Sequence, residues 1–286
     1  MRVAFDHLSQ EELDWQLSPS KSARDAVGVL QRLETETEEL ATAPGVLCTL
    51  DVAYGAGPRQ KMDLYRPRGA SDPIGCLVFI HGGFWQRGSK MWSGFPARCL
   101  TGNNWALVGV GYTLAPEASL AQIVDEMALA LSTLARRAGE FGLDRDRIVL
   151  AGHSAGAHLT AAILSGMGGE DAAQLPARAV LISGVYDLAP IAASYVNDAV
   201  GLVAADVPGL SPLYRRPLKD VPVHLLIGSE ESDAFHAQTN ALHTAWRQHL
   251  SQISLQVVPG CDHFDILDEL RAPDSPTGRF ILGQAG

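Results

Sequence analysis

Six short apolar runs, spaced along the last three quarters of the chain, constrain its fold more than any other feature of the sequence. They are CLVFI (76–80), WALVGVGY (105–112), RIVLAG (147–152), AVLISG (179–184), VHLLIG (223–228) and SLQVV (254–258). Their apolar residues are nearly continuous, which is typical of parallel strands that are buried on both faces. Helix-length amphipathic segments alternate with these runs, for example at 119–142 and 232–250. The alternation predicts an α/β fold, with a mostly parallel central sheet flanked by helices.

The residues before the first of these runs follow two different patterns. Residues 46–55 and 61–67 alternate between apolar and polar residues, which predicts two antiparallel strands joined by a turn. Residues 1–45 have helical periodicity and an acidic run, ETETEE, which we interpret as a solvated helix face. We therefore expect one or two helices that form an N-terminal extension over the main body. Since no repeat or linker is evident, we expect residues 1–286 to form a single domain.

The motif Gly152-His153-Ser154-Ala155-Gly156 follows the third apolar run and precedes a helix-forming stretch. It matches G-x-S-x-G, in which a sharp strand-to-helix turn exposes a nucleophilic serine at the edge of the sheet. Glycine is needed on both sides because larger side chains would collide in so tight a turn. The pattern predicts Ser154 as a catalytic nucleophile at the N-terminus of a helix, where free amides stabilise a developing oxyanion.

A serine hydroxyl becomes a good nucleophile only when a base removes its proton. In this architecture the order along the chain is serine, acid, histidine. His263 follows the last apolar run, whereas the other histidines lie in the N-terminal region, in predicted strands or helices, or near the serine. We therefore predict His263 as the base and structural roles for the others.

The acid is expected after the run VHLLIG, where Glu230, Glu231 and Asp233 all qualify by residue type. We favour Glu231, which comes three residues after Gly228. Asp233 is the alternative, although it could instead cap the following helix. Asp262, beside the histidine, is expected to be a loop or capping residue.

The segment FIHGGFW ends the first apolar run and predicts an oxyanion hole. Amides of a glycine-rich turn can approach an oxyanion because no side chain intervenes. We expect backbone N–H groups of Gly82, Gly83 and Phe84 to donate, together with that of Ala155. His81 is expected to brace this loop.

Several motifs taken together resemble one family, the kynurenine formamidases (arylformamidases) of the serine α/β-hydrolase type. They are HGGFWQRGSK, GYTLAPE, GHSAGAHL, SGVYDLAPI followed by VND and LSP, and the closing DHF. The resemblance extends from about residue 18 to about residue 270, and part of it is shared with esterases similar to hormone-sensitive lipase. It implies an α/β-hydrolase fold with Ser154 as nucleophile, His263 as base and the carboxylate after VHLLIG as acid. Many relatives have Asp where this chain has Glu231.

The resemblance also implies a substrate cleft under the N-terminal segment, lined by Phe84, Trp85, Tyr186 and Asn197. The implied reaction is hydrolysis of N-formylkynurenine to kynurenine and formate, through a formyl-serine intermediate. Trp92 is a further candidate for contact with the aromatic ring, and Arg87 and Lys90 are candidates for a substrate carboxylate. A carboxylesterase acting on small or aryl esters is the alternative, and a non-catalytic binding protein is a third hypothesis.

Composition restricts the partners. The formal net charge of −10 argues against a nucleic-acid partner. The four cysteines have no metal-binding or paired spacing, so we expect neither metal nor cofactor. No long apolar stretch or signal peptide is recognisable, so we expect a cytoplasmic protein with a small-molecule substrate and no membrane partner. The oligomeric state is open, with a homodimer as one alternative.

Overall fold

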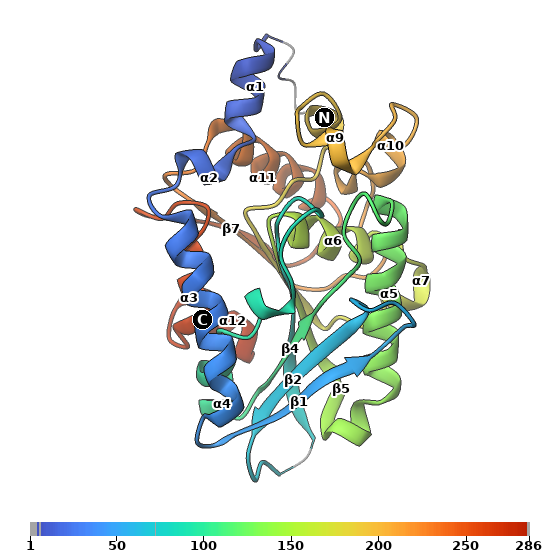
Figure 1. Cartoon of the computed structure of the whole chain (residues 1–286). Coiled ribbons are helices and arrows are strands. Elements are labelled where there is room, and N and C mark those ends of the chain that lie inside the picture. Colours follow the sequence, from blue (N-terminus) through green and yellow to red (C-terminus); the bar gives the residue numbers. More distant parts are fainter. Residues whose placement is uncertain (1–4, 6, 72, 285–286) are drawn as a thin grey trace.

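A single eight-stranded sheet forms the centre of the computed structural model, which describes residues 5, 7–71 and 73–284 (Figure 1). The strand order is β1-β2-β4-β3-β5-β6-β7-β8. Strand β2 is antiparallel to both β1 and β4, whereas all the other neighbours are parallel. The predicted α/β fold is thus confirmed. The strands are β1 (Val46–Ala53), β2 (Lys61–Pro67), β3 (Ile74–Ile80), β4 (Ala106–Val110), β5 (Leu143–His153), β6 (Arg178–Ile182), β7 (Val223–Gly228) and β8 (Ile253–Val258).

Helices cover both faces of this sheet. The α-helices are α1 (Gln10–Gln16), α2 (Pro19–Ser22), α3 (Ala26–Glu39), α4 (Ala97–Gly102), α5 (Leu120–Arg136), α6 (Ala155–Leu164), α7 (Glu170–Ala173), α8 (Ala189–Ala192), α9 (Asn197–Val200), α10 (Val207–Leu210), α11 (Asp233–Trp246) and α12 (Pro276–Leu282). Short 3₁₀ helices are η1 (Leu40–Thr42), η2 (Lys90–Trp92), η3 (Ala138–Phe141), η4 (Pro212–Tyr214) and η5 (Asp265–Arg271). Among the described residues, no helix is both long enough and apolar enough to cross a membrane.

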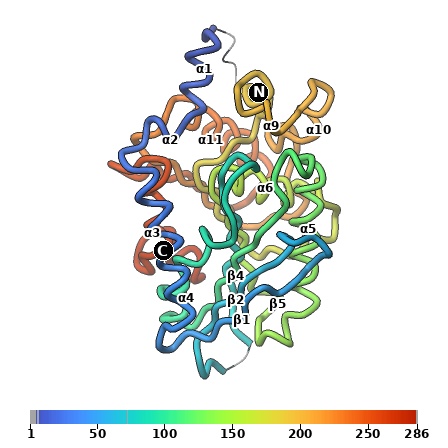
Figure 2. Tube along the Cα trace, viewed as in Figure 1, coloured from blue at the N-terminus to red at the C-terminus, as the bar shows by residue number. Residues whose placement is uncertain are grey.

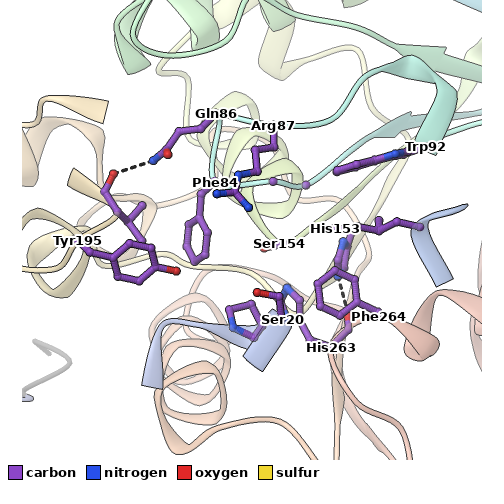
Figure 3. Close-up of a pocket in the computed structure, with 15 residues that line it drawn as sticks. Ser20, Phe84, Gln86, Arg87, Trp92, His153, Ser154, Tyr195, His263 and Phe264 are labelled. Carbon is purple, nitrogen blue, oxygen red and sulfur yellow. Dashed lines mark hydrogen bonds between the residues drawn. The ribbon is translucent and has the colours of Figure 1, made fainter. Parts of the chain in front are cut away.

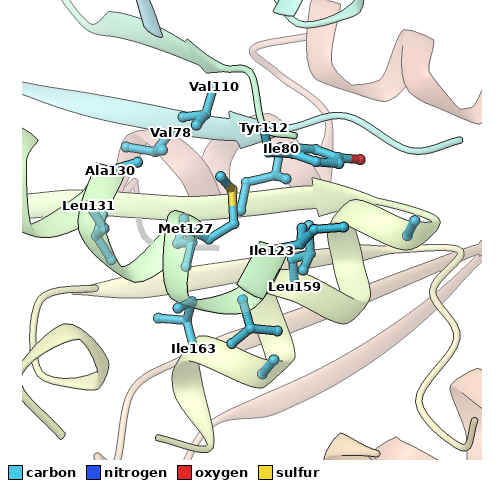
Figure 4. Close-up of a cluster of buried hydrophobic side chains, with 14 of the residues drawn as sticks. Val78, Ile80, Val110, Tyr112, Ile123, Met127, Ala130, Leu131, Leu159 and Ile163 are labelled. Carbon is cyan, nitrogen blue, oxygen red and sulfur yellow. The ribbon is translucent and has the colours of Figure 1, made fainter. Parts of the chain in front are cut away.

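Strand β3 shows why the apolar runs are continuous. Its alternate residues Val78 and Ile80 pack with side chains of α5 and α6, whereas Leu77 and Phe79 pack on the opposite face with residues of α3 and α4. Both faces of the strand are therefore removed from water, as in other parallel sheets. Figure 4 shows the first of these two cores, in which side chains from α5 and α6 meet the sheet.

Helix α5 illustrates how local sequence sets this packing. Ser119 caps its N-terminus in a capping box with Gln122, which satisfies amide groups that the helix itself leaves without acceptors. Ile123, Met127 and Leu131 recur at intervals of four residues and are buried on one face of the helix. The cap and the apolar stripe together fix where the helix begins and which face it turns to the sheet.

The N-terminal segment forms three α-helices and a 3₁₀ turn, rather than the one or two helices that we expected. Helix α3 runs beside the C-terminal segment, as Figures 1 and 2 show. The acidic run is not merely a solvated face, because Glu34 accepts a hydrogen bond from Trp92 and Glu36 pairs with Arg271. The predicted N-terminal extension (1–45) and the predicted single domain (1–286) include residues 1–4, 6, 72, 285 and 286, which lie outside the described part of the chain.

Candidate active site

Ser154 occupies the turn between β5 and α6 in a backbone conformation that is rare for a residue with a side chain, with φ +55° and ψ −118°. The two flanking glycines are required by contact. A Cβ on Gly152 would lie 2.1 Å from the Gly156 carbonyl oxygen, and a Cβ on Gly156 would lie 2.0 Å from that of Ile80. The turn therefore closes only with glycine at both positions, and it places the serine at the carboxyl end of the central strand.

Glu231 and His263 form a buried pair beside this turn. His263 Nδ1 donates to Glu231 Oε2 at 2.7 Å, and both side chains are almost fully inaccessible to solvent. Because Nδ1 carries the proton, Nε2 is left unprotonated in the neutral ring and can accept a proton. Ser154 and His263 line the same pocket (Figure 3). The serine and the histidine are therefore brought to one pocket, as transfer of the hydroxyl proton to the ring requires.

The second oxygen of the Glu231 carboxylate also accepts hydrogen bonds. Glu231 Oε1 accepts hydrogen bonds from Ser183 Oγ at 2.5 Å and from the Gly228 amide at 2.8 Å. A buried carboxylate is stable only when hydrogen bonds replace its hydration. These two donors fix the carboxylate in the plane from which it reaches His263. Ser183 was not singled out from the sequence, because nothing in the motif SGV indicates where the serine side chain points.

The other acidic candidates do not reach His263. Glu230 and Asp233 are exposed, and Asp233 is the first residue of helix α11. Asp262 accepts from the amides of Phe264 and Asp265, which is the loop role expected for it. The Arg24 amide also donates to Asp262, so the N-terminal segment is attached to the loop that carries His263.

His153 contributes more to the site than the structural role that we predicted for it. Its Nε2 donates to the His263 carbonyl oxygen at 2.7 Å, and the two ring centroids are 4.6 Å apart. His153 also lines the pocket. Burial, together with the neighbouring His263, holds the pKa of His153 well below its usual value, so the ring is neutral at pH 7. A neutral ring orients His263 without adding a competing charge.

The loop after β3 approaches Ser154 with its backbone. Gly82, Gly83 and Phe84 line the pocket, and Ala155 follows the serine as the first residue of α6, where the helix offers no acceptor for its amide. Gly83 has φ +105°, a conformation that favours glycine. The four residues predicted for the oxyanion hole therefore flank the nucleophile.

Buried rings support this loop from behind. Tyr112 Oη donates to the His81 carbonyl oxygen at 3.0 Å, and the rings of Tyr112 and His81 stack 4.3 Å apart. His81 Nδ1 donates to the Gly82 carbonyl oxygen at 2.8 Å, and burial lowers the pKa of His81 to about 4. His81 is therefore a neutral group that braces the loop, as its position in the sequence suggested.

The pocket around Ser154 is lined mainly by aromatic and aliphatic side chains. Its aromatic members are Phe84, Trp92, Tyr195 and Phe264, and Pro19, Ser20 and Leu30 of the N-terminal segment close one side. Figure 3 shows these rings around the serine. The predicted cleft beneath the N-terminal segment is therefore present in the structure, and an aromatic group fits its walls.

Three of the four side chains predicted to line this cleft lie elsewhere. Trp85 and Tyr186 are completely buried in the apolar cores, where Trp85 packs edge-on against His158. Asn197 Nδ2 donates to the Ala192 and Leu202 carbonyl oxygens, so it holds a loop together. None of these three side chains is among those that line the pocket, because a family motif gives the position of a residue but not the direction of its side chain. Only Phe84 lies in the pocket as predicted.

Tyr195 and Phe264 occupy the places that we had given to Trp85 and Tyr186. Phe264 follows His263 directly and could have been found as a neighbour of the base, whereas the sequence around Tyr195 contains no comparable signal. Of the two cations considered for a substrate carboxylate, Arg87 lines the pocket, whereas Lys90 is paired with Asp51 and Asp63. Among the described residues, no group of three or more His, Cys, Asp or Glu side chains is placed to hold a metal ion.

Comparison with known proteins places the chain among hydrolases. Residues 77–266 match a family model described as the alpha/beta hydrolase fold. The kynurenine formamidase of Danio rerio is 30% identical to this chain, and the match covers 92% of each protein. The kynurenine formamidase of Salmo salar is also 30% identical, and the match covers 98% of this chain and 97% of the relative. A solved structure of a candidate thioesterase from Silicibacter is 28% identical, with a TM-score of 0.85 over 94% of this chain and 98% of the other. A carboxylesterase, EstE1, with 20% identity and a TM-score of 0.68 over 98% and 96% of the two chains, shares the fold.

Proposed function

Because this chain belongs to the kynurenine formamidase family, within the α/β-hydrolase fold, we propose that it is a serine hydrolase that cleaves the formyl amide of N-formyl arylamines. The proposed substrate is N-formylkynurenine, and the products are kynurenine and formate. One observation carries the proposal: the Glu231–His263 pair and Ser154 meet in a pocket whose walls are aromatic.

The proposed reaction begins with attack on the formyl carbon. Ser154 Oγ adds to that carbon while His263 Nε2 takes the hydroxyl proton, and Glu231 stabilises the imidazolium that forms. The carbonyl oxygen becomes an oxyanion, for which the amides of Gly83, Phe84 and Ala155 are the donors. Collapse of the tetrahedral intermediate breaks the C–N bond, and His263 gives its proton to the departing aniline nitrogen. A formyl ester of Ser154 remains.

Water then removes the formyl group. His263 takes a proton from water, the resulting hydroxide adds to the formyl carbon, and Ser154 leaves as an alcohol after it receives that proton. Formate is released and the enzyme is restored. The chain's own residues supply each proton transfer, and the stepwise route replaces one difficult hydrolysis with two easier steps.

The space beside Ser154 supports a small acyl group. A Cβ placed on Gly82 would lie 3.0 Å from the Ser154 Cβ and 2.9 Å from the His153 carbonyl oxygen. The backbone of the oxyanion loop therefore packs closely against the nucleophile. A formyl group carries only hydrogen on its carbonyl carbon, so it needs less room here than any other acyl group. The aromatic walls supply the larger space for the arylamine.

A carboxylesterase acting on small or aryl esters is the second candidate. An esterase would use the same nucleophile, base and acid. A region of 110 residues, or 38% of this chain, is 33% identical to a probable isoprenylcysteine alpha-carbonyl methylesterase of Arabidopsis thaliana. A binding protein without activity is disfavoured, since Ser154, His263 and Glu231 are all present and Glu231 is bonded to His263.

Turnover of paired substrates separates the two enzymatic functions. Formanilide and phenyl formate differ only in the leaving atom, so each rate is compared with the uncatalysed hydrolysis of the same compound. We expect a larger acceleration for the formanilide and rapid release of kynurenine from N-formylkynurenine. A strong preference for the ester, with N-formylkynurenine left intact, would establish the esterase instead.

We also propose that the enzyme acts in the cytoplasm on a small molecule, without a nucleic-acid or membrane partner. The formal net charge of −10 supports the exclusion of nucleic acid. Cell fractionation tests the location. Light scattering of the purified chain tests whether it is a monomer or the homodimer that the sequence left open.

A further inference from the structure

The described residues that line the pocket around Ser154 carry one permanent charge. Arg87 is the only lysine or arginine among them, and no aspartate or glutamate is included. The Glu231 carboxylate is buried behind His263 and is taken up by its own hydrogen bonds. The lining residues therefore present one positive and no negative permanent charge, which favours a negatively charged substituent on the substrate.

The Arg87 guanidinium is available to a ligand. Arg87 is exposed, and within the described part of the chain its side chain makes no hydrogen bond or ion pair. Lys90, three residues later, differs in this respect because Asp51 and Asp63 neutralise it. An unpaired arginine at the edge of a hydrophobic pocket can bind a carboxylate through two parallel hydrogen bonds.

The backbone of Arg87 is held firmly against the oxyanion loop. The amides of Gln86 and Arg87 both donate to the Gly83 carbonyl oxygen at 3.0 Å, and a Cβ on Gly83 would lie 2.4 Å from the Arg87 carbonyl oxygen. Gln86 Nε2 donates to the Val196 carbonyl oxygen at 2.6 Å, which ties this turn to the opposite wall. The backbone of the arginine is therefore fixed beside the predicted oxyanion loop, and Figure 3 shows its side chain extending toward the pocket.

We propose that Arg87 determines specificity by binding a carboxylate on the leaving-group side of the substrate. This inference rests on the proposed function, and it narrows the substrate class to aryl formamides whose arylamine part carries a carboxylate. A formyl group offers no position for a carboxylate, because its carbonyl carbon carries only hydrogen. The charged group must therefore belong to the arylamine, whose ring lies between the aromatic walls while its acidic substituent extends to the rim.

The test removes the positive charge of Arg87 from the enzyme and, separately, the carboxylate from the substrate. Wild type, Arg87→Gln and Arg87→Lys are assayed with N-formylkynurenine and with its carboxamide, which keeps the α-amino group but lacks the carboxylate. Arg145→Gln is the matched control, because Arg145 is exposed at the opposite end of β5. A second pair, 3-acetoxybenzoate and phenyl acetate, asks the same question of ester hydrolysis.

We expect Arg87→Gln to lower kcat/KM for N-formylkynurenine by about tenfold, mainly through KM, and by at least fivefold more than for the carboxamide. Added salt should reduce the difference in kcat/KM between N-formylkynurenine and its carboxamide. Arg87→Lys should retain part of the wild-type preference for N-formylkynurenine, and Arg145→Gln should retain all of it. Equal losses of kcat/KM for N-formylkynurenine and for its carboxamide, or no loss for either, would overturn the role of Arg87.

Failure of the proposed function gives a different result. If the wild-type enzyme releases no kynurenine, the proposed formamidase function is wrong. The role of Arg87 is then tested by comparing hydrolysis of 3-acetoxybenzoate and phenyl acetate. A selective loss with 3-acetoxybenzoate then supports anion binding by Arg87 in an esterase. Equal behaviour of the two esters overturns it.

Discussion

Glu231 Oε2 accepts a hydrogen bond from His263 Nδ1 at 2.7 Å, while the other oxygen of the same carboxylate accepts from Ser183 and from the Gly228 amide. The carboxylate is thus fully hydrogen-bonded in a site from which water is excluded. It fixes the tautomer of His263 and compensates the charge that develops on the ring. A glutamate serves here because its longer side chain still reaches the histidine from the position three residues after the strand.

Glu231→Gln is expected to lower kcat for N-formylkynurenine by about three to four orders of magnitude, because the amide cannot compensate an imidazolium and can force the wrong tautomer. Asp233→Asn is the matched control, since Asp233 is exposed at the start of α11. Steady-state kinetics of both variants decide the assignment. A disabled Asp233→Asn beside an active Glu231→Gln would identify Asp233 as the acid.

Removal of the Ser183 hydroxyl is expected to lower kcat about tenfold with little change in KM, because one of the hydrogen bonds that position Glu231 is lost. Ser183 has φ +52°, so Ser183→Gly also relieves backbone strain. The glycine variant should therefore show the same decrease in kcat as Ser183→Ala but have the higher Tm. Wild-type kcat in both variants would show that Ser183 does not position the acid.

The mostly parallel sheet, the turn at Ser154 and the pair of Glu231 and His263 could be predicted from the sequence, whereas the order of the strands within the sheet was not predicted. Each of the predicted features depends on local constraints: continuous apolar runs, glycines that a tight turn requires, and the chain order of a known type of site. The walls of the pocket could not be predicted in the same way. Whether Trp85 or Trp92 faces the cleft depends on the φ and ψ of a loop in which Phe84 and Trp85 both have positive φ. Tyr195 approaches from a segment far from the catalytic motifs.

Phe84→Ala is expected to raise KM for N-formylkynurenine by about tenfold, because the ring lines the pocket and its loss removes apolar contact with the substrate. Tyr186→Phe is the contrasting variant, since Tyr186 is buried in a core away from the lining. Its KM should change by less than about twofold. Similar increases in KM for both variants would return Tyr186 to the binding site.

Stability is expected to fall as the pH falls from 6.5 toward 4. Burial lowers the pKa of His158 to about 4, so the unfolded state binds a proton in this range that the folded state does not. Between pH 7 and pH 5 this residue alone accounts for a loss of about 2 kcal/mol in the free energy of unfolding. The buried His81 and His153 act in the same direction.

Urea denaturation at pH 7 and pH 5 measures this loss. In His158→Gln, whose amide can still donate to the Leu210 carbonyl oxygen, the decrease should be smaller than in wild type. The same decrease in both proteins would mean that His158 is protonated in the folded state or does not contribute.

The proposed mechanism depends most directly on Ser154 as the nucleophile. The measurement is kcat/KM for the release of kynurenine from N-formylkynurenine by wild type and by Ser154→Ala, with circular dichroism to establish that the variant is folded. Because the members of a triad act as a unit, we expect the variant to lose several orders of magnitude. A folded Ser154→Ala with activity near that of wild type would contradict catalysis by this serine.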